Sequence, residues 1–208
     1  MARYLLINYG GIIMEKYFLY IVLTRTNTVI SNLIHMVTND DYTHAAISLD
    51  KELESMYSFA RRNTYNPFIG RFKKEDINEG IYKFNEILPG TIIEVEVTKE
   101  QYEKAKALID SFINNSDKYK YNYRGLIYNL LNKPVTIENR FLCSEFVYFI
   151  LKESGVVDFN IARNLVKPQD LLKVNGKIIY EGNLREIKPL NNRFSIKEMI
   201  KSHIKVIS

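Results

Sequence analysis

Cysteine, histidine and tryptophan are all scarce in this chain. Its 208 residues include one cysteine, three histidines and no tryptophan. One cysteine cannot form an intramolecular disulfide, so the sequence gives no sign of an oxidising compartment. It also excludes a zinc site built from several cysteines, and three histidines do not favour a histidine-rich metal site. We therefore predict that the protein uses no cofactor and no metal ion.

The chain also lacks long apolar runs and dense runs of one charge. The apolar stretches at residues 4–7 and 17–23 are far shorter than the roughly 20 residues of a membrane helix, and neither is typical of a signal peptide. The net charge of +5 is scattered over 29 basic and 24 acidic residues. We predict no nucleic-acid partner and leave contact with an anionic membrane surface open. We expect a cytoplasmic protein that starts at Met1 or Met14; its oligomeric state cannot be read from the sequence.

The length and the hydrophobic content of 46% fit one globular domain over residues 1–208. We treat residues 1–16 as an N-terminal extension and residues 195–208 as a C-terminal helical tail. Alternating apolar positions predict strands, and apolar positions at a spacing of 3.6 predict helices. The expected strands are residues 17–23, 42–49, 54–59, 91–97, 177–182 and 184–187. The expected helices are residues 28–38, 98–113, 126–131, 143–153 and a short turn from 167, in addition to the tail. Together they predict an α+β fold.

The stretch of residues 61–90 has little periodicity. We interpret it mostly as loop, with a short strand-like piece at 81–84 and a turn at Pro89-Gly90. A long irregular segment beside a hairpin is a candidate for shaping a substrate site.

The only cysteine, Cys143, lies where a loop becomes a helix. Gly155 marks the expected end of this helix. Its buried face is predicted to hold Phe146, Val147, Ile150 and Leu151. A thiol in the first helical turn faces the positive end of the helix dipole, which favours the nucleophilic thiolate. The alternative is a cysteine that serves only as a small buried hydrophobe.

A histidine on a strand is the natural partner for such a thiol. His44 shares one face of strand 42–49 with Ala46 and Ser48. These small neighbours leave room for another element to approach the ring. His35, beside the apolar face of a predicted helix, is better explained as a packed or surface residue. A Cys143–His44 pair would form the two halves of a thiol hydrolase site.

Four motifs resemble the circularly permuted papain-fold hydrolases, the NlpC-like and YiiX-like group. They are Tyr20-Ile-Val-Leu-Thr-Arg-Thr, Tyr42-Thr-His-Ala-Ala-Ile-Ser-Leu, Tyr57-Ser-Phe-Ala-Arg-Arg and Phe141-Leu-Cys-Ser-Glu-Phe-Val. The resemblance runs from about residue 17 to residue 187, and the histidine precedes the cysteine as permutation requires. It implies Cys143 as nucleophile, His44 as general base, and a small antiparallel sheet packed on the cysteine helix.

The third member of such a site orients the histidine ring. The family usually carries a polar residue, often a carboxylate, on the strand after the histidine strand. No acid stands at the matching place near the end of strand 54–59, so the resemblance implies Ser58, or Tyr57 if the register slips by one residue.

The leading functional hypothesis is a cysteine hydrolase that cleaves an amide bond of a peptide or peptidoglycan fragment through a thioacyl intermediate. One alternative is a lipid thiol acyltransferase or hydrolase of the lecithin:retinol acyltransferase type, which would take an acyl substrate. The other is a non-catalytic ligand-binding module on the same fold, motivated by the missing carboxylate.

Overall fold

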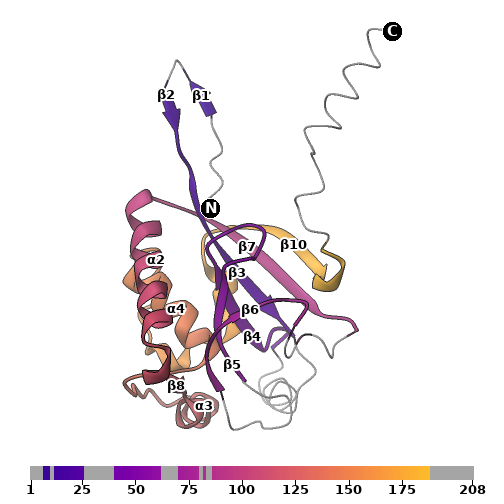
Figure 1. The fold of residues 1–208 in the computed structure, drawn as a ribbon. Coiled ribbons are helices and arrows are strands. Elements are labelled where there is room, and N and C mark those ends of the chain that lie inside the picture. Colours follow the sequence, from indigo (N-terminus) through magenta and orange to yellow (C-terminus); the bar gives the residue numbers. More distant parts are fainter. Residues whose placement is uncertain are drawn as a thin grey trace, which may run out of the picture.

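A computed structural model describes the chain except for residues 1–6, 10–11, 26–39, 62–69, 80–81, 83–85 and 188–208. The helix expected at 28–38, with His35, and the C-terminal tail lie outside the described residues, as does most of the strand-like piece at 81–84. The structure is α+β, with antiparallel strands and several helices (Figure 1).

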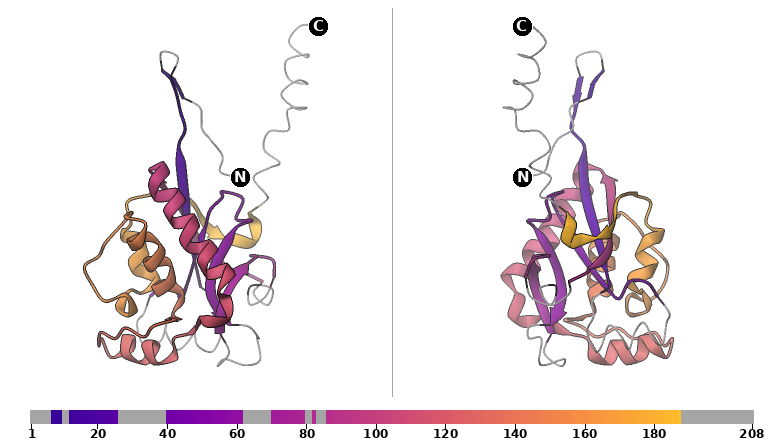
Figure 2. Two further views of the ribbon diagram at one scale, coloured as in Figure 1. Left: turned by 60° about the vertical axis from the view of Figure 1, so that its left-hand side comes forward. Right: turned by 90° about the vertical axis from the view of Figure 1, so that its right-hand side faces the viewer.

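A six-stranded antiparallel sheet forms the centre, in the order β10-β7-β3-β4-β5-β6. Its strands are β3 (Tyr17–Thr24), β4 (His44–Ser48), β5 (Met56–Arg61), β6 (Gly70–Glu75), β7 (Pro89–Val97) and β10 (Lys177–Asn183). Two small sheets pair β1 (Ile7–Tyr9) with β2 (Ile12–Met14), and β8 (Lys120–Tyr121) with β9 (Arg140–Phe141). The β1–β2 hairpin leads directly into β3 and extends beyond the main sheet (Figures 1 and 2).

The helices follow the sequence patterns closely. They are α2 (Lys99–Asn114), α3 (Tyr123–Leu130) and α4 (Cys143–Glu153), with short 3-10 turns at Ser116–Lys118, Arg163–Leu165, Pro168–Lys173 and Leu184–Glu186. The predicted capping box at the start of α2 is confirmed, because the Thr98 and Gln101 side chains each bond the backbone N–H of the other residue. Gly155, just beyond α4, has a φ of +77°, a left-handed conformation that suits glycine at a helix end.

One face of the main sheet packs against α2 and α4 (Figures 1 and 2). Alternate strand residues such as Ile21, Ala45 and Ile47 meet α4 residues such as Phe146 and Val147 in one apolar core. The small side chain of Ala45 allows α4 to lie close to β4. The predicted packing of the cysteine helix on the histidine strand is therefore confirmed.

The opposite face of the sheet carries a second, smaller core. Val22, Ala46 and Met56 pack there against Tyr82 and Leu88, which come from the segment between β6 and β7. The small neighbour Ala46 therefore makes room on the His44 face for Tyr82. The cysteine helix packs on the other face of β4.

Three expectations about strands and loops are wrong. Residues 70–75 form strand β6, and Pro89-Gly90 begins β7 instead of forming a turn. Residues 184–186 form a 3-10 turn where we expected a strand. Strand β6 escaped detection because its residues, Gly-Arg-Phe-Lys-Lys-Glu, do not alternate between apolar and polar positions, and it lies at the edge of the sheet.

Candidate functional site

Cys143 is the first residue of α4 and is almost buried, with 7% of its surface exposed. The backbone before it is extended at Leu142, whose N–H donates to the Glu145 carboxylate at 2.7 Å. The neighbouring Ser144 hydroxyl donates to the Val166 carbonyl at 2.6 Å. These two bonds fix the start of the helix, so Cys143 is held at a helix N-terminus where N–H groups lack helical partners.

His44 is the first residue of β4 and is also 7% exposed. Its Nε2 lies 2.9 Å from Oε2 of Glu75. The Cys143 side chain lies close enough to interact with the same ring as a hydrogen-bond partner and as a charge. Because Glu75 occupies Nε2, the nitrogen left to face the thiol is Nδ1. The structure thus brings Cys143 and His44 together.

Glu75 ends strand β6 and is 2% exposed. Its Oε2 also accepts a hydrogen bond of 2.9 Å from the hydroxyl of Tyr82. The amino group of Lys73 lies 3.8 Å from the other carboxylate oxygen. Burial raises the pKa of Tyr82 well above its usual value, so the phenol keeps the proton that it donates.

The charge state of the pair follows from these contacts. Burial lowers the pKa of His44, but the Glu75 carboxylate and the Cys143 thiol outweigh it and raise the pKa to about 10. Burial raises the pKa of Glu75, and the charge and hydrogen bond of His44 more than offset this, so the net pKa is lowered. An imidazolium therefore lies between a carboxylate and the thiol at neutral pH.

Ser58, the residue implied as third member, lies at the same ring. Its hydroxyl is 3.4 Å from Nε2 of His44, longer than the contact made by Glu75. Tyr57 points elsewhere, since its ring stacks on Phe72 with centroids 5.8 Å apart. The expected absence of a carboxylate beside His44 is wrong: Glu75 supplies one from a different strand.

Sequence reasoning missed Glu75 for a specific reason. The resemblance places the residue that orients His44 on β5, next to the histidine strand, whereas Glu75 lies on β6, one strand further. The ladder between β4 and β5 pairs only Ile47 with Tyr57 and Ser48 with Met56, at the end away from His44. The sequence offered one indication of a charged site here: Lys73 and Glu75 lie on the same face if residues 70–75 form a strand.

A second buried carboxylate lies near the start of α4, close to Cys143. Glu145, on the first turn of α4, accepts hydrogen bonds from Leu142 N–H and, at 2.9 Å, from the Asn122 side-chain amide. The Arg163 guanidinium lies 3.7 Å from its other oxygen. Burial raises the pKa of Glu145, which these three partners only partly offset. This cluster supports the helix start and does not touch His44.

A small cavity of about 30 Å³ opens at Cys143. That volume is about the share of one water molecule in the liquid. Its wall includes Cys143, Thr43, Tyr121, Leu126, Asn129 and Lys167. A planar carbonyl group would fit at the thiol, while the rest of a substrate would lie outside this space.

The described residues contain no group of three or more His, Cys, Asp or Glu side chains placed to hold a metal ion. None of the helices that the structure describes is long and apolar enough to cross a membrane.

Comparison with protein-family models, with curated proteins and with solved structures gives no match to this chain. The structure itself shows an α+β fold with a six-stranded antiparallel sheet.

Proposed function

We propose that the protein is a cysteine hydrolase that cleaves an amide bond, with Cys143 as nucleophile, His44 as general acid and base, and Glu75 as the residue that orients His44. The observation that carries the proposal is the buried chain of contacts from thiol to imidazole to carboxylate. A nucleophile, a base and a group that orients the base form the recurring arrangement for nucleophilic catalysis.

In the first step, the Cys143 thiolate attacks the carbonyl carbon of the substrate amide and a C–S bond forms. The carbonyl oxygen becomes an oxyanion, which the backbone N–H of Cys143 at the start of α4 stabilises. The His44 imidazolium then gives its proton to the amide nitrogen, the C–N bond breaks, and the amine leaves. The products of this step are a thioester on Cys143 and a neutral imidazole.

In the second step, the neutral His44 ring takes a proton from a water molecule, which attacks the thioester carbonyl. The C–S bond breaks, the carboxylic acid leaves, and the thiolate–imidazolium pair returns. Glu75 stays ionised throughout, because its role is to hold Nε2–H and stabilise the positive ring.

The permuted papain-like fold remains part of this proposal. Its support is the resemblance of the four motifs, together with an antiparallel sheet that carries His44 and packs on the helix that begins at Cys143. The non-catalytic alternative depended on a missing carboxylate, and Glu75 removes that reason.

The test is the rate at which iodoacetamide alkylates Cys143 at pH 6, where an ordinary thiol is almost fully protonated. We expect Cys143 to react at least about tenfold faster than free cysteine. The His44→Ala variant should react about 10²-fold more slowly than the parent protein, since it loses the partner that holds the thiolate. Mass spectrometry of the intact chain reports the rate directly, because the chain has one cysteine.

His35→Ala is the matched control and should alkylate at the parental rate. His44→Gln, checked by circular dichroism, separates loss of the imidazole from loss of the fold. Alkylation of the folded parent protein no faster than that of free cysteine would overturn the proposal.

Lipid acyl chemistry is a second candidate, favoured by one observation. Ile127 and Leu131, in and just after α3, are each 59% exposed, and Leu126 beside them lines the cavity at Cys143. An acyl chain or a membrane surface could cover these side chains. Binding to phosphatidylcholine vesicles that Ile127→Ser and Leu131→Ser abolish would support this candidate, and no binding would count against it.

A further inference from the structure

A larger cavity, of about 360 Å³, lies next to the one at Cys143. Tyr121 lines both, so the two cavities share a wall. The wall of the larger cavity carries three cationic side chains, Arg71, Lys120 and Arg140, and one carboxylate, Asp117. Its volume falls in the range of roughly 300–1,000 Å³ that is typical of small-molecule sites.

Two of the three cations occupy paired positions on neighbouring strands. Strands β8 and β9 pair in parallel with Lys120 opposite Arg140, and like charges directly opposite across a strand pair destabilise it. Among the described residues, no carboxylate lies within 4.0 Å of Lys120, Arg140 or Arg71. A bound anion would relieve this repulsion.

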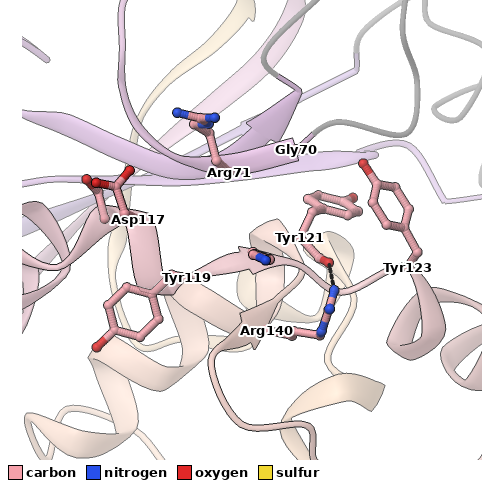
Figure 3. A pocket seen from close by; sticks show the side chains of 9 residues that line it. Gly70, Arg71, Asp117, Tyr119, Tyr121, Tyr123 and Arg140 are labelled. Carbon is pink, nitrogen blue, oxygen red and sulfur yellow. Dashed lines mark hydrogen bonds between the residues drawn. The ribbon is translucent and has the colours of Figure 1, made fainter.

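Three tyrosines, Tyr119, Tyr121 and Tyr123, also line this cavity. Figure 3 shows Tyr121 and Tyr123 side by side, with Arg71 and Arg140 on opposite sides of the cavity; the two tyrosine rings have centroids 4.8 Å apart. A Cβ on Gly70 would lie 2.7 Å from Cδ2 of Tyr121, so only glycine at this position admits the ring. The cavity therefore combines cations with aromatic rings that a substrate backbone can lie against.

The distance to the nucleophile is limited by the chain itself. Arg140 precedes Cys143 by three residues along β9 and the extended Leu142. Three extended residues span at most about 10–11 Å. The backbone of Arg140 therefore lies no more than about three peptide units from that of Cys143.

We infer that this cavity binds an anionic group, a carboxylate or a phosphate, on the same amide substrate that Cys143 attacks. The group lies two to three residue lengths from the scissile bond. This inference rests on the proposed function, and it adds a specificity subsite made of Arg71, Lys120 and Arg140.

The experiment uses the full chain and two series of thiol-reactive peptides. Bromoacetyl-(Gly)n, with n from 1 to 4, ends in a carboxylate, a carboxamide or an aminoethyl phosphate and probes the leaving-group side. Succinyl- and acetyl-(Gly)n chloromethyl ketones probe the acyl side. In one of the series we expect the anionic probe to alkylate Cys143 about tenfold faster than the neutral one, with the maximum at n of 2 or 3. The phosphate arm tells which anion the cavity prefers.

The Arg71→Gln/Lys120→Gln double variant should lose this preference through a higher half-saturating probe concentration, with the maximal rate unchanged. Asp117→Asn should increase the preference. The charge-matched control, Lys104→Gln/Lys106→Gln on the exposed side of α2, should keep it.

Equal rates for anionic and neutral probes at every length in both series would overturn the inference. Rapid alkylation by bromoacetamide in the same experiment would leave the proposed function standing. Slow alkylation by bromoacetamide would instead overturn the proposed function, and the subsite with it.

Discussion

Two buried glutamates flank the Cys143–His44 pair, and their pKa values shift in opposite net directions although burial raises both. Glu75 has a lowered pKa, because the charge and hydrogen bond of His44 overcome the cost of burial. Glu145 has a raised pKa, because its hydrogen bonds from Asn122 and from Leu142 N–H, with Arg163 at 3.7 Å, do not overcome that cost.

The difference shows what a buried carboxylate needs in order to remain charged. Neutral donors and an arginine beyond hydrogen-bond distance offset only part of the rise in pKa that burial causes. A cation in direct contact, the His44 ring at 2.9 Å, reverses that rise. Glu75 is therefore suited to hold a positive ring during a reaction, and Glu145 is suited to anchor a helix start. Three predictions test this comparison.

The largest effect is expected for Glu75→Gln. Removing the carboxylate removes a main cause of the raised pKa of His44, so that pKa should fall from about 10 toward the ordinary value of 6.5. NMR titration of the ring protons measures this, and with three histidines the spectrum is simple. Each pKa unit is a tenfold change in the ratio of imidazolium to imidazole. At pH 8 the ring of the variant would be mostly neutral and would no longer stabilise the Cys143 thiolate, so alkylation should slow by at least about tenfold.

Glu79→Gln is the control for this experiment, since it removes an exposed acid four residues further along the chain. It should leave the pKa of His44 unchanged. A His44 pKa that stays near 10 in Glu75→Gln would show that the thiol alone holds the imidazolium.

The second prediction concerns stability on either side of pH 4.5, from about pH 3 to pH 6.5, measured by urea unfolding. The folded pKa of Glu75 is lowered, so its contribution is present above pH 4.5 and is lost as the pH falls. The folded pKa of Glu145 is raised, so its contribution is present below pH 4.5 and is lost as the pH rises. His44, whose folded pKa is also raised, loses its contribution only above pH 6.5, outside this range.

Relative to the parent protein, Glu75→Gln should therefore become less stable as the pH rises toward 4.5, and Glu145→Gln should become more stable as the pH rises above 4.5. The two variants serve as controls for each other. Curves that change in the same direction would contradict the assignment of opposite charge states.

The smallest effect is expected for Ser58→Ala. The hydroxyl lies 3.4 Å from Nε2 of His44 and is neutral, so its removal should slow Cys143 alkylation less than about tenfold. Comparison with Glu75→Gln under the same conditions ranks the two residues. A larger loss in Ser58→Ala would make the serine, and not Glu75, the residue that orients the ring.

Sequence periodicity predicted those elements whose own pattern is strong. Strand β3, the capping box of α2 and the helix that begins at Cys143 all combine a clear apolar period with a recognisable start or stop. Strand β6 could not be predicted in this way, because it is an edge strand rich in charge and its pairing with β5 is set by tertiary structure.

Like the fold, the candidate site could be predicted from the sequence only in part. Cys143 and His44 are marked by position, one at a helix start and the other on a strand with small neighbours. Glu75 is not, because its role depends on how three strands bring distant residues together. Its partner Tyr82 lies in the short piece at 81–84 that we expected to be strand-like, and a contact between such distant segments leaves no periodic pattern in a sequence.

The single cysteine also decides how this site responds to oxidants. The proposed mechanism uses Cys143 as a thiolate, and a thiolate is the form that peroxide oxidises to sulfenic acid. This chain has no second thiol to capture that product as an internal disulfide. Recovery of Cys143 therefore requires a thiol from outside the chain, and without one oxidation proceeds to the irreversible sulfinic and sulfonic acids.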